Sequence, residues 1–498
     1  MALIQITDLT FTYPGSFDPV FEHVSFQLDT DWRLGLTGRN GRGKTTLLRL
    51  LQGQYPHQGT ITAPGGFEYF PYPIPDAALT PLELLECSFP DVPQWRLRRE
   101  LAPLFVTDDA LYRPFSTLSG GEQAKILLAL LFAREGRYLL IDEPTNHLDE
   151  TGRALVSRYL AKKSGFLLVS HDRAFLDGCV DHILSINRGG IEVQKGNFSS
   201  WYENRQRQDA FELAQNAQLK KEIGRLKQAA RQSRAWADKV ENTKIGPHSA
   251  KVTGEADAMG GRAYIGEQSR RMQQRRKNLE RRQNAAIEEK SALLKNIEQA
   301  APLKLHQLPY HTDRLALLRD VSVCYGGAPV CRGVSFCVEQ GDRIALRGAN
   351  GTGKTSLLRL LCGENIPHTG TVACGSRLQI SHVQQDPSGL RGNLSAYAAQ
   401  HGLDESLFKA ILRKLDFARV QFEKDMADFS AGQKKKVLLA RSLCEPSHLL
   451  VWDEPLNYVD VLSRIQLEEL LLEFQPTIVF VEHDRVFCDR VATKAVTL

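Results

Sequence analysis

The sequence predicts an α/β protein built from two copies of one domain, with a long basic helical segment between them. Four short motifs occur twice in the same order, and each second occurrence follows the first by 310 to 312 residues. Chance does not preserve both the order and the spacing of four motifs, so the chain contains a duplication. Short apolar runs lead directly into several motifs in both copies, which is typical of buried parallel strands.

The repeated motifs are a glycine-rich loop, a serine–glycine motif, an acidic motif and a histidine motif. They span residues 38–45, 118–123, 141–144 and 170–173 in the first copy, and 348–355, 429–433, 452–455 and 482–485 in the second. The apolar runs predict strands over residues 33–37, 138–141, 166–169, 343–346, 448–451 and 477–481. The motif residues should therefore meet at the carboxyl ends of strands, where open α/β sheets bind ligands.

The segment between the copies is predicted to be a helical hairpin. Residues from about 204 to 240 and from about 267 to 300 contain no proline and are rich in Leu, Ala, Gln, Lys, Glu and Arg, most of which favour helices. Glycine and proline mark residues 241–266 as a tip loop between the two helices. The sequence thus predicts a first domain over 1–200, a hairpin linker over 201–305 and a second domain over 306–498.

Positive charge is concentrated in this linker. Residues 201–300 contain 21 Lys and Arg against 13 Asp and Glu, whereas the whole chain has a formal net charge of +5. Such an excess suits a polyanion such as nucleic acid, because phosphate contacts release counterions. On charge alone, a solvated helical face is the simpler interpretation, and both remain open at this point.

The composition excludes several classes of protein. Hydrophobic residues make up 42% and charged residues 24% of the chain, as in ordinary globular proteins. The longest apolar run, around residues 126–133, is too short to span a bilayer, and the N-terminus lacks the pattern of a secretion signal. Nine cysteines without a Cys-x-x-Cys pair argue against a disulfide framework or a zinc site. We therefore expect a cytoplasmic protein with reduced thiols.

The glycine-rich loop of each copy predicts a phosphate cradle. Its spacing, Gly-x-x-x-x-Gly-Lys-Thr after a strand, lets backbone N–H groups face a phosphate, while the lysine reaches the β- and γ-phosphates of a nucleotide. The threonine that follows the lysine is suited to bind Mg²⁺. The predicted nucleotide-binding residues are Gly38, Asn40, Gly41, Gly43, Lys44, Thr45 and Thr46 in the first copy, and Gly348, Asn350, Gly351, Gly353, Lys354, Thr355 and Ser356 in the second.

The acidic and histidine motifs predict hydrolytic chemistry. Asp142 and Asp453 end apolar strands, where each is suited to hold Mg²⁺ directly or through water. The next residue in each copy, Glu143 or Glu454, is placed to orient or deprotonate an attacking water. His171 and His483 follow another strand and could contact a γ-phosphate. A single histidine there would more often be structural, but the repetition favours a functional role.

Tyr13 and Tyr325 precede the glycine-rich loops by similar distances. Each could stack on a purine ring, although an isolated aromatic residue is more often part of a core.

These motifs together resemble the ATP-binding cassette (ABC) superfamily. The resemblance rests on Ser119-Gly-Gly-Glu-Gln and on the Asp-Glu-Pro-Thr-Asn-His-Leu-Asp run that begins at Asp142, both following a phosphate loop. Two cassettes joined by a basic helical linker resemble the F subfamily, ABC-F, whose members act on ribosomes. The second copy, with Phe429-Ser-Ala-Gly-Gln-Lys-Lys-Lys436, Trp452-Asp-Glu-Pro-Leu-Asn-Tyr-Val-Asp460 and Val481-Glu-His-Asp484, resembles the Lsa-type antibiotic-resistance branch of that subfamily.

The resemblance implies two ABC-type P-loop ATPase domains that close head to tail over two ATP molecules, as a monomer with an intramolecular cassette dimer. Site one would join Lys44, Thr45, Asp142, Glu143 and His171 to Ser430 and Gly432. Site two would join Lys354, Thr355, Asp453, Glu454 and His483 to Ser119, Gly120 and Gly121. Mg²⁺ would be held by Thr45 and Asp142 in one site and by Thr355, Gln385 and Asp453 in the other.

The sequence departs from the family pattern in two places. The family's Q-loop glutamine corresponds to Gln385 in the second copy, but to Tyr72 in the first. Ala431 replaces the first glycine of the serine–glycine signature. Both departures fall on site one, so we hypothesise that the two ATP sites are unequal.

The resemblance further implies a ribosome-binding protein of the cytoplasm that protects the 70S ribosome from lincosamides, pleuromutilins and streptogramin A compounds. The linker would enter the exit site and contact 23S rRNA and P-site tRNA, with no membrane or DNA partner. Three alternatives remain open: a general translation factor of the same subfamily, the ATPase subunit of a membrane transporter, and a DNA-repair ATPase. The linker has no evident role in a transporter subunit, and DNA-repair ATPases have far longer coiled coils.

Overall fold

A computed structural model describes residues 2–15, 19–146, 148–187, 190–244, 274, 281, 307–325, 328–349, 351–415, 417 and 419–498. The chain divides into two compact units, one formed by Met1–Trp201 with Ala300–Leu498 and the other by Tyr202–Gln299. Both copies of the duplicated domain belong to the first unit. All nine cysteines are free, and none of the helices in the described residues is long and apolar enough to cross a membrane.

The first copy contains two sheets. A three-stranded antiparallel sheet has the order β2-β1-β4, and a six-stranded sheet has the order β5-β6-β7-β3-β8-β9, in which only β9 is antiparallel to its neighbour. The strands are β1 (Leu3–Phe11), β2 (Phe21–Asp29), β3 (Arg33–Gly38), β4 (Gln58–Thr62), β5 (Phe67–Phe70), β6 (Tyr138–Asp142), β7 (Phe166–Val169), β8 (His182–Asn187) and β9 (Gly190–Lys195). The helices are α1 (Lys44–Leu51), α2 (Pro81–Ser88), α3 (Gln94–Leu101), α4 (Gly120–Ala133), α5 (Glu150–Leu160) and α6 (Arg173–Cys179).

The second copy repeats this plan. Its sheets have the orders β11-β10-β13, antiparallel, and β14-β15-β16-β12-β17, parallel. The strands are β10 (Arg314–Tyr325), β11 (Ala328–Glu339), β12 (Arg343–Arg347), β13 (His368–Cys374), β14 (Ile380–Val383), β15 (Leu449–Asp453), β16 (Ile478–Val481) and β17 (Lys494–Thr497). The helices are α9 (Lys354–Leu361), α10 (Leu394–Gln400), α11 (Glu405–Lys414), α12 (Ala431–Cys444), α13 (Val461–Phe474) and α14 (Arg485–Val491).

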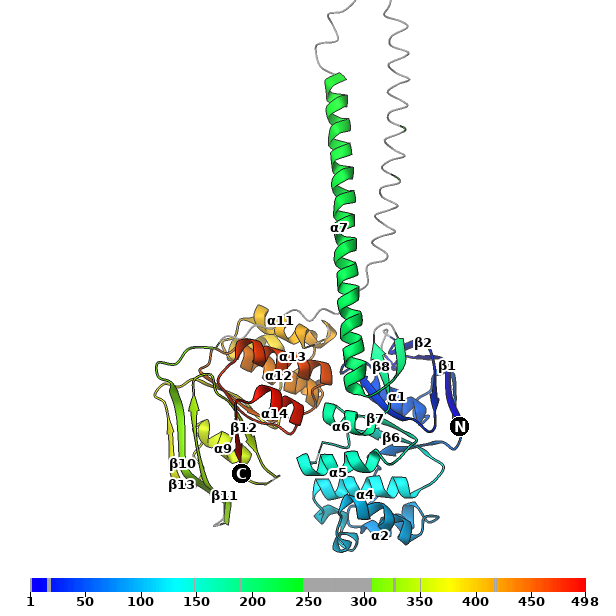
Figure 1. Cartoon of the computed structure of the whole chain (residues 1–498), viewed down its shortest axis with the longest axis vertical. Coiled ribbons are helices and arrows are strands. Elements are labelled where there is room, and N and C mark those ends of the chain that lie inside the picture. Colours follow the sequence, from blue (N-terminus) through cyan, green and yellow to red (C-terminus); the bar gives the residue numbers. More distant parts are fainter. Residues whose placement is uncertain are drawn as a thin grey trace, which may run out of the picture. The chain divides into compact units, whose positions relative to one another are not determined.

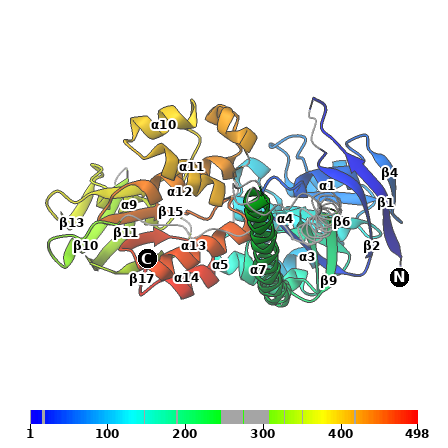
Figure 2. The same ribbon diagram turned by 90° about the horizontal axis from the view of Figure 1, so that it is seen from above.

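The core of each copy explains this layering. In the second copy, α9 lies between β10 and the parallel sheet (Figure 1). The leucines of α9 share a core with residues of β10 and with alternate residues of β15 and β16. The remaining residues of the same strands, among them Trp452 and Phe480, face α12 and α13 in a second core. Seen from above, α10 and α11 lie away from β10 and β13 (Figure 2). A parallel sheet covered on both faces reads as continuous apolar runs, which is why the sequence revealed these strands.

The predicted strands are confirmed. The six runs correspond to β3, β6, β7, β12, β15 and β16, with ends that differ by no more than two residues. The motifs follow these strands, so their residues lie at the carboxyl edges of the two parallel sheets.

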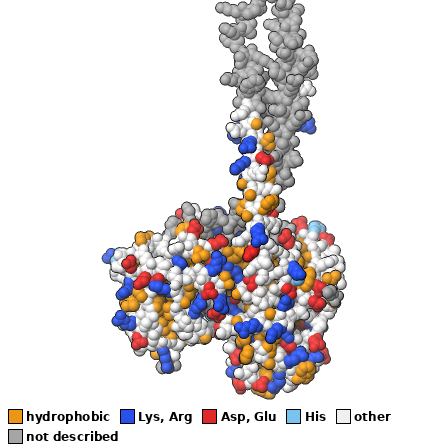
Figure 3. Space-filling model, viewed as in Figure 1, with side chains coloured by type: hydrophobic (Ala, Val, Ile, Leu, Met, Phe, Trp, Pro, Cys, Tyr) orange, Lys and Arg blue, Asp and Glu red, His pale blue; other side chains and the backbone are white. Residues whose placement is uncertain are grey.

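The first linker helix is also confirmed. It is α7 (Phe198–Lys244), a continuous helix of 47 residues (Figure 1), which is longer at both ends than the predicted run. At 1.5 Å per residue it is roughly 70 Å long. Lys and Arg side chains project from it (Figure 3), including the exposed Lys220, Lys221, Arg225, Lys227 and Arg231. The tip loop beyond residue 244 and the predicted helix over 267–300 lie outside the described residues, apart from residues 274 and 281.

Candidate nucleotide-binding sites

The glycine-rich loops have nearly the same backbone in both copies. Gly43 and Gly353, which begin α1 and α9, have φ angles of 89° and 84°, and Gly41 and Gly351 have φ angles of 81° and 83°. L-residues with a side chain rarely adopt this conformation, so the glycines are required here. A Cβ atom at Gly43 would also lie 2.6 Å from Val20. Asn350 lies outside the described residues.

The lysine of each loop is buried and bonded to the loop itself. Lys44 Nζ donates to the carbonyl oxygens of Gly38 and Arg39 at 2.6 and 3.2 Å, and Lys354 Nζ donates to those of Gly348 and Ala349 at 2.9 and 2.7 Å. Burial lowers the pKa of both lysines. Each ammonium therefore lies inside a ring of main-chain groups, as a phosphate cradle requires.

The two predicted purine-stacking tyrosines lie beside these loops. The Tyr13 hydroxyl lies 2.7 Å from Thr46 Oγ1, and the Tyr325 hydroxyl lies 3.1 Å from Ser356 Oγ. The structure thus brings Thr46 and Ser356, the last residues of the predicted cradles, next to the tyrosines. The stacking role itself stays a prediction.

The serine–glycine motifs begin helices α4 and α12 through capping boxes. The side chains of Ser119 and Ser430 accept hydrogen bonds from the backbone N–H groups of Glu122 and Gln433, whose side chains in turn accept from the serine N–H groups. This reciprocal arrangement is what the Ser-x-x-Glu and Ser-x-x-Gln spacing predicts. The first turns of both helices keep backbone N–H groups without intrahelical acceptors, at Gly120 and Gly121 and at Ala431 and Gly432, which suits an anion.

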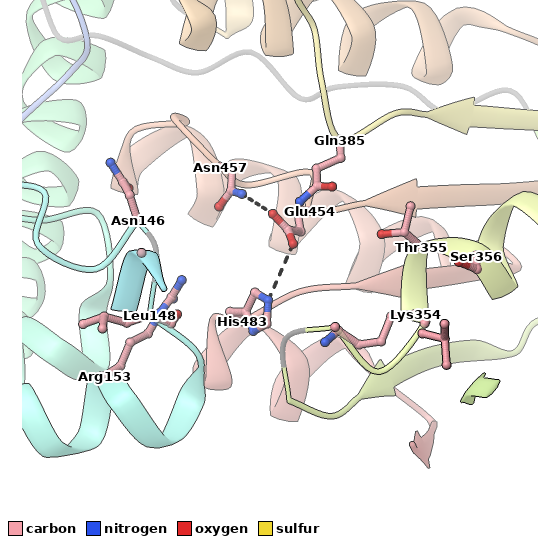
Figure 4. A pocket seen from close by; sticks show the side chains of 14 residues that line it. Asn146, Leu148, Arg153, Lys354, Thr355, Ser356, Gln385, Glu454, Asn457 and His483 are labelled. Carbon is pink, nitrogen blue, oxygen red and sulfur yellow. Dashed lines mark hydrogen bonds and ion pairs between the residues drawn. The ribbon is translucent and has the colours of Figure 1, made fainter. Parts of the chain in front are cut away.

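The second acidic site opens onto a cavity of about 480 Å³. Lys354, Thr355, Gln385, Glu454 and His483 of the second copy line it, as Figure 4 shows. Gly120, Asn146, Leu148 and Arg153 of the first copy line the same cavity. The structure therefore brings Gly120 together with the second phosphate loop, as predicted for site two. Ser119 and Gly121 adjoin Gly120 but do not line the cavity.

Within this cavity, Glu454 is held by its neighbours. Asn457 donates to its carboxylate, and His483 Nε2 lies 3.6 Å from Glu454 Oε1 (Figure 4). Burial pushes the pKa of Glu454 upward, but interactions with His483 and Gln385 outweigh it, so the pKa lies below its ordinary value. Glu454 is therefore ionised at neutral pH.

The first acidic site has different surroundings. Asp142 Oδ2 accepts hydrogen bonds from Thr45 Oγ1 at 3.3 Å and from the Tyr69 hydroxyl at 2.9 Å. His171 Nε2 lies 3.2 Å from Glu143 Oε1. Burial, reinforced by the charge of Asp142, raises the pKa of Glu143 to about 8. Burial and the charge of Lys44 hold the pKa of His171 well below its ordinary value, so the histidine is neutral.

Residues of the second copy complete this first site. Asn40 Nδ2 donates to the carbonyl oxygen of Tyr458 at 2.9 Å. A Cβ atom at Gly432 would lie 2.5 Å from that oxygen and 3.3 Å from Asn40 Nδ2. Gly432 thus lies against the first phosphate loop, as predicted for site one, and only glycine fits there. Ala431 and Ser430 precede it at the start of α12.

Strand register locates the Q-loop difference. Phe70 pairs with Ile141, and Val383 pairs with Trp452. Each of these partners directly precedes the aspartate of its acidic motif. Tyr72 and Gln385 follow these strands by the same number of residues, so Tyr72 does occupy the place of the glutamine. Its ring packs on Phe89, with centroids 5.0 Å apart. Within the Tyr69-Phe-Pro-Tyr72 run, the residue that contacts Asp142 is Tyr69 and not Tyr72, which the sequence analysis did not predict.

The second site also fits a magnesium ion. Asp453 Oδ1 is buried, and no group in the described residues forms a hydrogen bond with it. The carboxylate interacts with Thr355. A buried carboxylate oxygen without a protein donor, beside a threonine hydroxyl, is the kind of ligand that Mg²⁺ takes in addition to phosphate oxygens.

Comparisons with known proteins agree with this geometry. A family model described as ABC transporter matches residues 21–68 and 331–457. The ATP-binding protein Uup of Caulobacter vibrioides is 29% identical over 96% of this chain and 75% of its own length. The ribosome protection protein VmlR of Bacillus subtilis is 26% identical, with 98% and 85% covered. The energy-dependent translational throttle protein EttA of Escherichia coli K12 is 25% identical, with 95% and 88% covered.

The chain is thus similar over nearly its whole length to ATP-binding proteins of the ABC type. Its two cassettes are ABC ATPase domains, and the protein is an ATPase. The chain also shares its fold with solved structures. A chain from the crystal structure of an archaeal ribosomal stalk protein with an archaeal ribosome recycling factor superposes with a TM-score of 0.62 at 18% identity, covering 98% of this chain and 87% of that one. RNase-L Inhibitor gives a TM-score of 0.58 at 19% identity, with 93% and 82% covered.

Proposed function

We propose that this ABC-F protein protects the ribosome from lincosamides, pleuromutilins and streptogramin A compounds in the cytoplasm. Its linker would enter the exit site, contact 23S rRNA and P-site tRNA and dislodge the drug. The observation that carries the proposal is α7, a 47-residue helix with exposed lysines and arginines between two ATPase cassettes. Such a helix is long, and its exposed lysines and arginines can form ion pairs with the phosphates of a nucleic acid. The Lsa-like motifs of the second cassette and the full-length similarity to VmlR support it further.

ATP would drive this activity through closure of the cassettes. Each nucleotide would lie between the phosphate loop of one cassette and the signature helix of the other, which is α4 in the first cassette and α12 in the second. Its γ-phosphate would therefore hold the two cassettes together. Glu454 would accept a proton from the attacking water, and His483 would orient the γ-phosphate. Mg²⁺, held by Thr355, Gln385 and Asp453 or by Thr45 and Asp142, would neutralise charge on the β- and γ-phosphates. Loss of the γ-phosphate would release the protein from the ribosome.

The two sites would contribute unequally. At neutral pH Glu454 is ionised, whereas the pKa of Glu143 is about 8. A protonated carboxyl group cannot accept a proton from water. Site two would therefore carry most of the hydrolysis, while site one would mainly bind ATP and keep the cassettes together.

A general translation factor is the second candidate. It is favoured by the similarity, over 95% of this chain, to the energy-dependent translational throttle protein EttA. Such a factor would bind the ribosome through the same basic helix but would leave drug binding unchanged.

One experiment separates the two candidates. The double variant Glu143→Gln, Glu454→Gln should bind ATP and hydrolyse it slowly. It would be sedimented with 70S ribosomes that carry a radiolabelled lincosamide, in ATP and, as a control, in ADP. ATP-dependent binding with loss of drug supports protection, and binding with drug retained supports the general factor. Absence of binding would overturn both.

A matched variant tests the role of α7. Replacing Lys220, Lys221, Arg225, Lys227 and Arg231 by glutamine keeps the helix but removes its exposed charge. We expect weaker ribosome binding and a shallower dependence of affinity on salt concentration, because fewer counterions are released. ATP turnover without ribosomes should be unchanged.

A further inference from the structure

Lys435 is a buried lysine whose contacts are unlike those of the phosphate-loop lysines. It lies on the first turns of α12, and its exposed fraction is 0%. Its Nζ donates to three main-chain oxygens, those of Gln384 at 2.7 Å, Gln385 at 3.3 Å and Asp453 at 3.0 Å. An ammonium group has three N–H donors, so these contacts use its full capacity. Burying a charged group is costly unless it is well paired, so this arrangement calls for an explanation.

The three oxygens belong to the ends of two neighbouring strands. Gln384 and Gln385 follow β14, and Asp453 ends β15, which pairs with β14 in parallel. Lys435 therefore ties the strand ends together behind the ATP cavity, which Gln385 and Thr355 line. The side chains of Gln385 and Asp453 are the proposed ligands of Mg²⁺ there. Fixing their main chains fixes the distance between the two ligands.

The first cassette has no lysine at the position that corresponds to Lys435. Lys435 is five residues after Ser430, and the residue five after Ser119 is Ala124. Ala124 lines a cavity of about 550 Å³ together with Tyr72, Asp142 and Glu143. There the acidic residue is held by a different group, the Tyr69 hydroxyl, which donates to Asp142 itself. The three main-chain contacts of Lys435, called the lysine clamp below, are thus found at the second site, and the position of Lys435 is taken by Ala124 at the first.

We propose that Lys435 is a positioning residue for the second ATP site, which holds Gln385 and Asp453 in register and ties both to α12. This inference rests on the proposed roles of Gln385 and Asp453. Because α12 begins with Ser430 and Gly432, which belong to site one, the clamp also joins the two sites through one helix. ATP binding by Lys354 and the glycine-rich loop does not depend on the clamp, whereas hydrolysis does.

The test uses the full chain without ribosomes. Lys435→Met keeps the length of the side chain and removes its donors, and Lys434→Met, at the adjacent and partly exposed lysine, is the control. We expect kcat for ATP to fall about 10-fold and KM to change less than about 3-fold. The Mg²⁺ concentration for half-maximal binding of a fluorescent ATP analogue, measured in a Lys44→Ala background, should rise. Lys434→Met should match the wild type in all three.

A double-mutant cycle separates positioning from general structure. Because Lys435 acts in part through Gln385, adding Lys435→Met to Gln385→Ala should slow turnover by clearly less than Lys435→Met slows the wild type. Lys435→Gln, which keeps amide donors, should lie between wild type and Lys435→Met and serves if the methionine variant does not fold. An unchanged kcat and Mg²⁺ requirement, or full additivity with Gln385→Ala, would overturn the inference. The assay needs no ribosome, so failure of the proposed ribosomal function would be seen separately.

Discussion

The two cassettes have similar phosphate loops but differ in the residues around their acidic motifs. Both have glycines with the same positive φ angles, a buried lysine bonded to its own loop and a capping box at the signature helix. Around the acidic motif they diverge. The first cassette has Tyr69 on Asp142 and a glutamate whose pKa is about 8, and the second has Gln385, Lys435 and an ionised Glu454. The two cassettes therefore share the ATP-binding frame and differ in the groups around the acidic motif.

The largest effect should come from the two glutamates. We expect Glu454→Gln to lower ATP turnover about 100-fold or more, because it removes the ionised base. Glu143→Gln should lower turnover by less than about 3-fold, since that carboxyl is largely protonated at neutral pH. Steady-state phosphate release by each purified variant measures both. Equal losses would contradict the inequality of the sites.

The second effect concerns an ion pair between the cassettes. Arg173 is the last residue of the first histidine motif, and its Nη2 lies 2.5 Å from Glu468 Oε2 on α13. Glu468 has an exposed fraction of 0% and also pairs with Arg490 at 2.5 Å. Arg485 occupies the corresponding position of the second cassette, but its side chain is 69% exposed, and it lies 4.0 Å from Glu150. The corresponding arginines of the two cassettes therefore form ion pairs that differ in burial and in distance.

Removing these arginines should reveal the difference. Arg173→Ala leaves a buried carboxylate with one partner fewer and should cost about 3 kcal/mol of the free energy of unfolding. Arg485→Ala should cost about 0.5 kcal/mol or less, because exposed pairs contribute little. Thermal unfolding of both variants beside the wild type gives the comparison. Similar costs would mean that the Arg173 pair does not stabilise the junction.

The sequence predicted the frame of these sites well and their differences only in part. Motif spacing located the glycines, the lysines, Asp453 and Glu454, because backbone requirements at a phosphate loop leave few residue choices. It identified Tyr72 and Ala431 as departures. It could not predict that Tyr69 would contact Asp142, or that Lys435 would turn inward to three carbonyls. Both depend on side-chain direction across two strands and a helix, which a linear pattern does not encode.

A third, smaller effect tests Tyr69. Burial raises the pKa of Asp142, and the hydrogen bond from Tyr69 opposes this rise. In Tyr69→Phe the ionised carboxylate loses this support, so its affinity for Mg²⁺ should weaken. We expect the Mg²⁺ concentration needed for half-maximal ATP binding at site one to rise about 3-fold, equivalent to one lost hydrogen bond. Measuring this in a Lys354→Ala background isolates site one. Tyr72→Phe is the control, and an equal shift in both variants would mean that the Tyr69 hydroxyl has no special role.

A further effect should appear as acid sensitivity confined to one cassette. The buried face of α3 includes Glu100 beside Leu97 and Leu101, whereas that of α11 consists of Phe408, Ile411 and Leu412. The Tyr159 hydroxyl donates to Glu100 Oε2 at 2.7 Å, and Lys163 pairs with the same carboxylate. Burial pushes the pKa of Glu100 upward, but these partners outweigh it, and the pKa lies below the ordinary 4.5.

A depressed pKa stabilises the fold above the pKa of the unfolded chain, and this stability is lost as the pH falls through the lower folded value. Glu100→Gln should therefore lower the free energy of unfolding by about 1 to 2 kcal/mol at pH 7. The difference in this free energy between variant and wild type should become smaller below pH 4.5. Thermal unfolding at a series of pH values follows this gap. A gap that stays constant down to acid pH would mean that Glu100 stabilises α3 by packing rather than by its charge, and the two cassettes would then not differ in acid sensitivity through this residue.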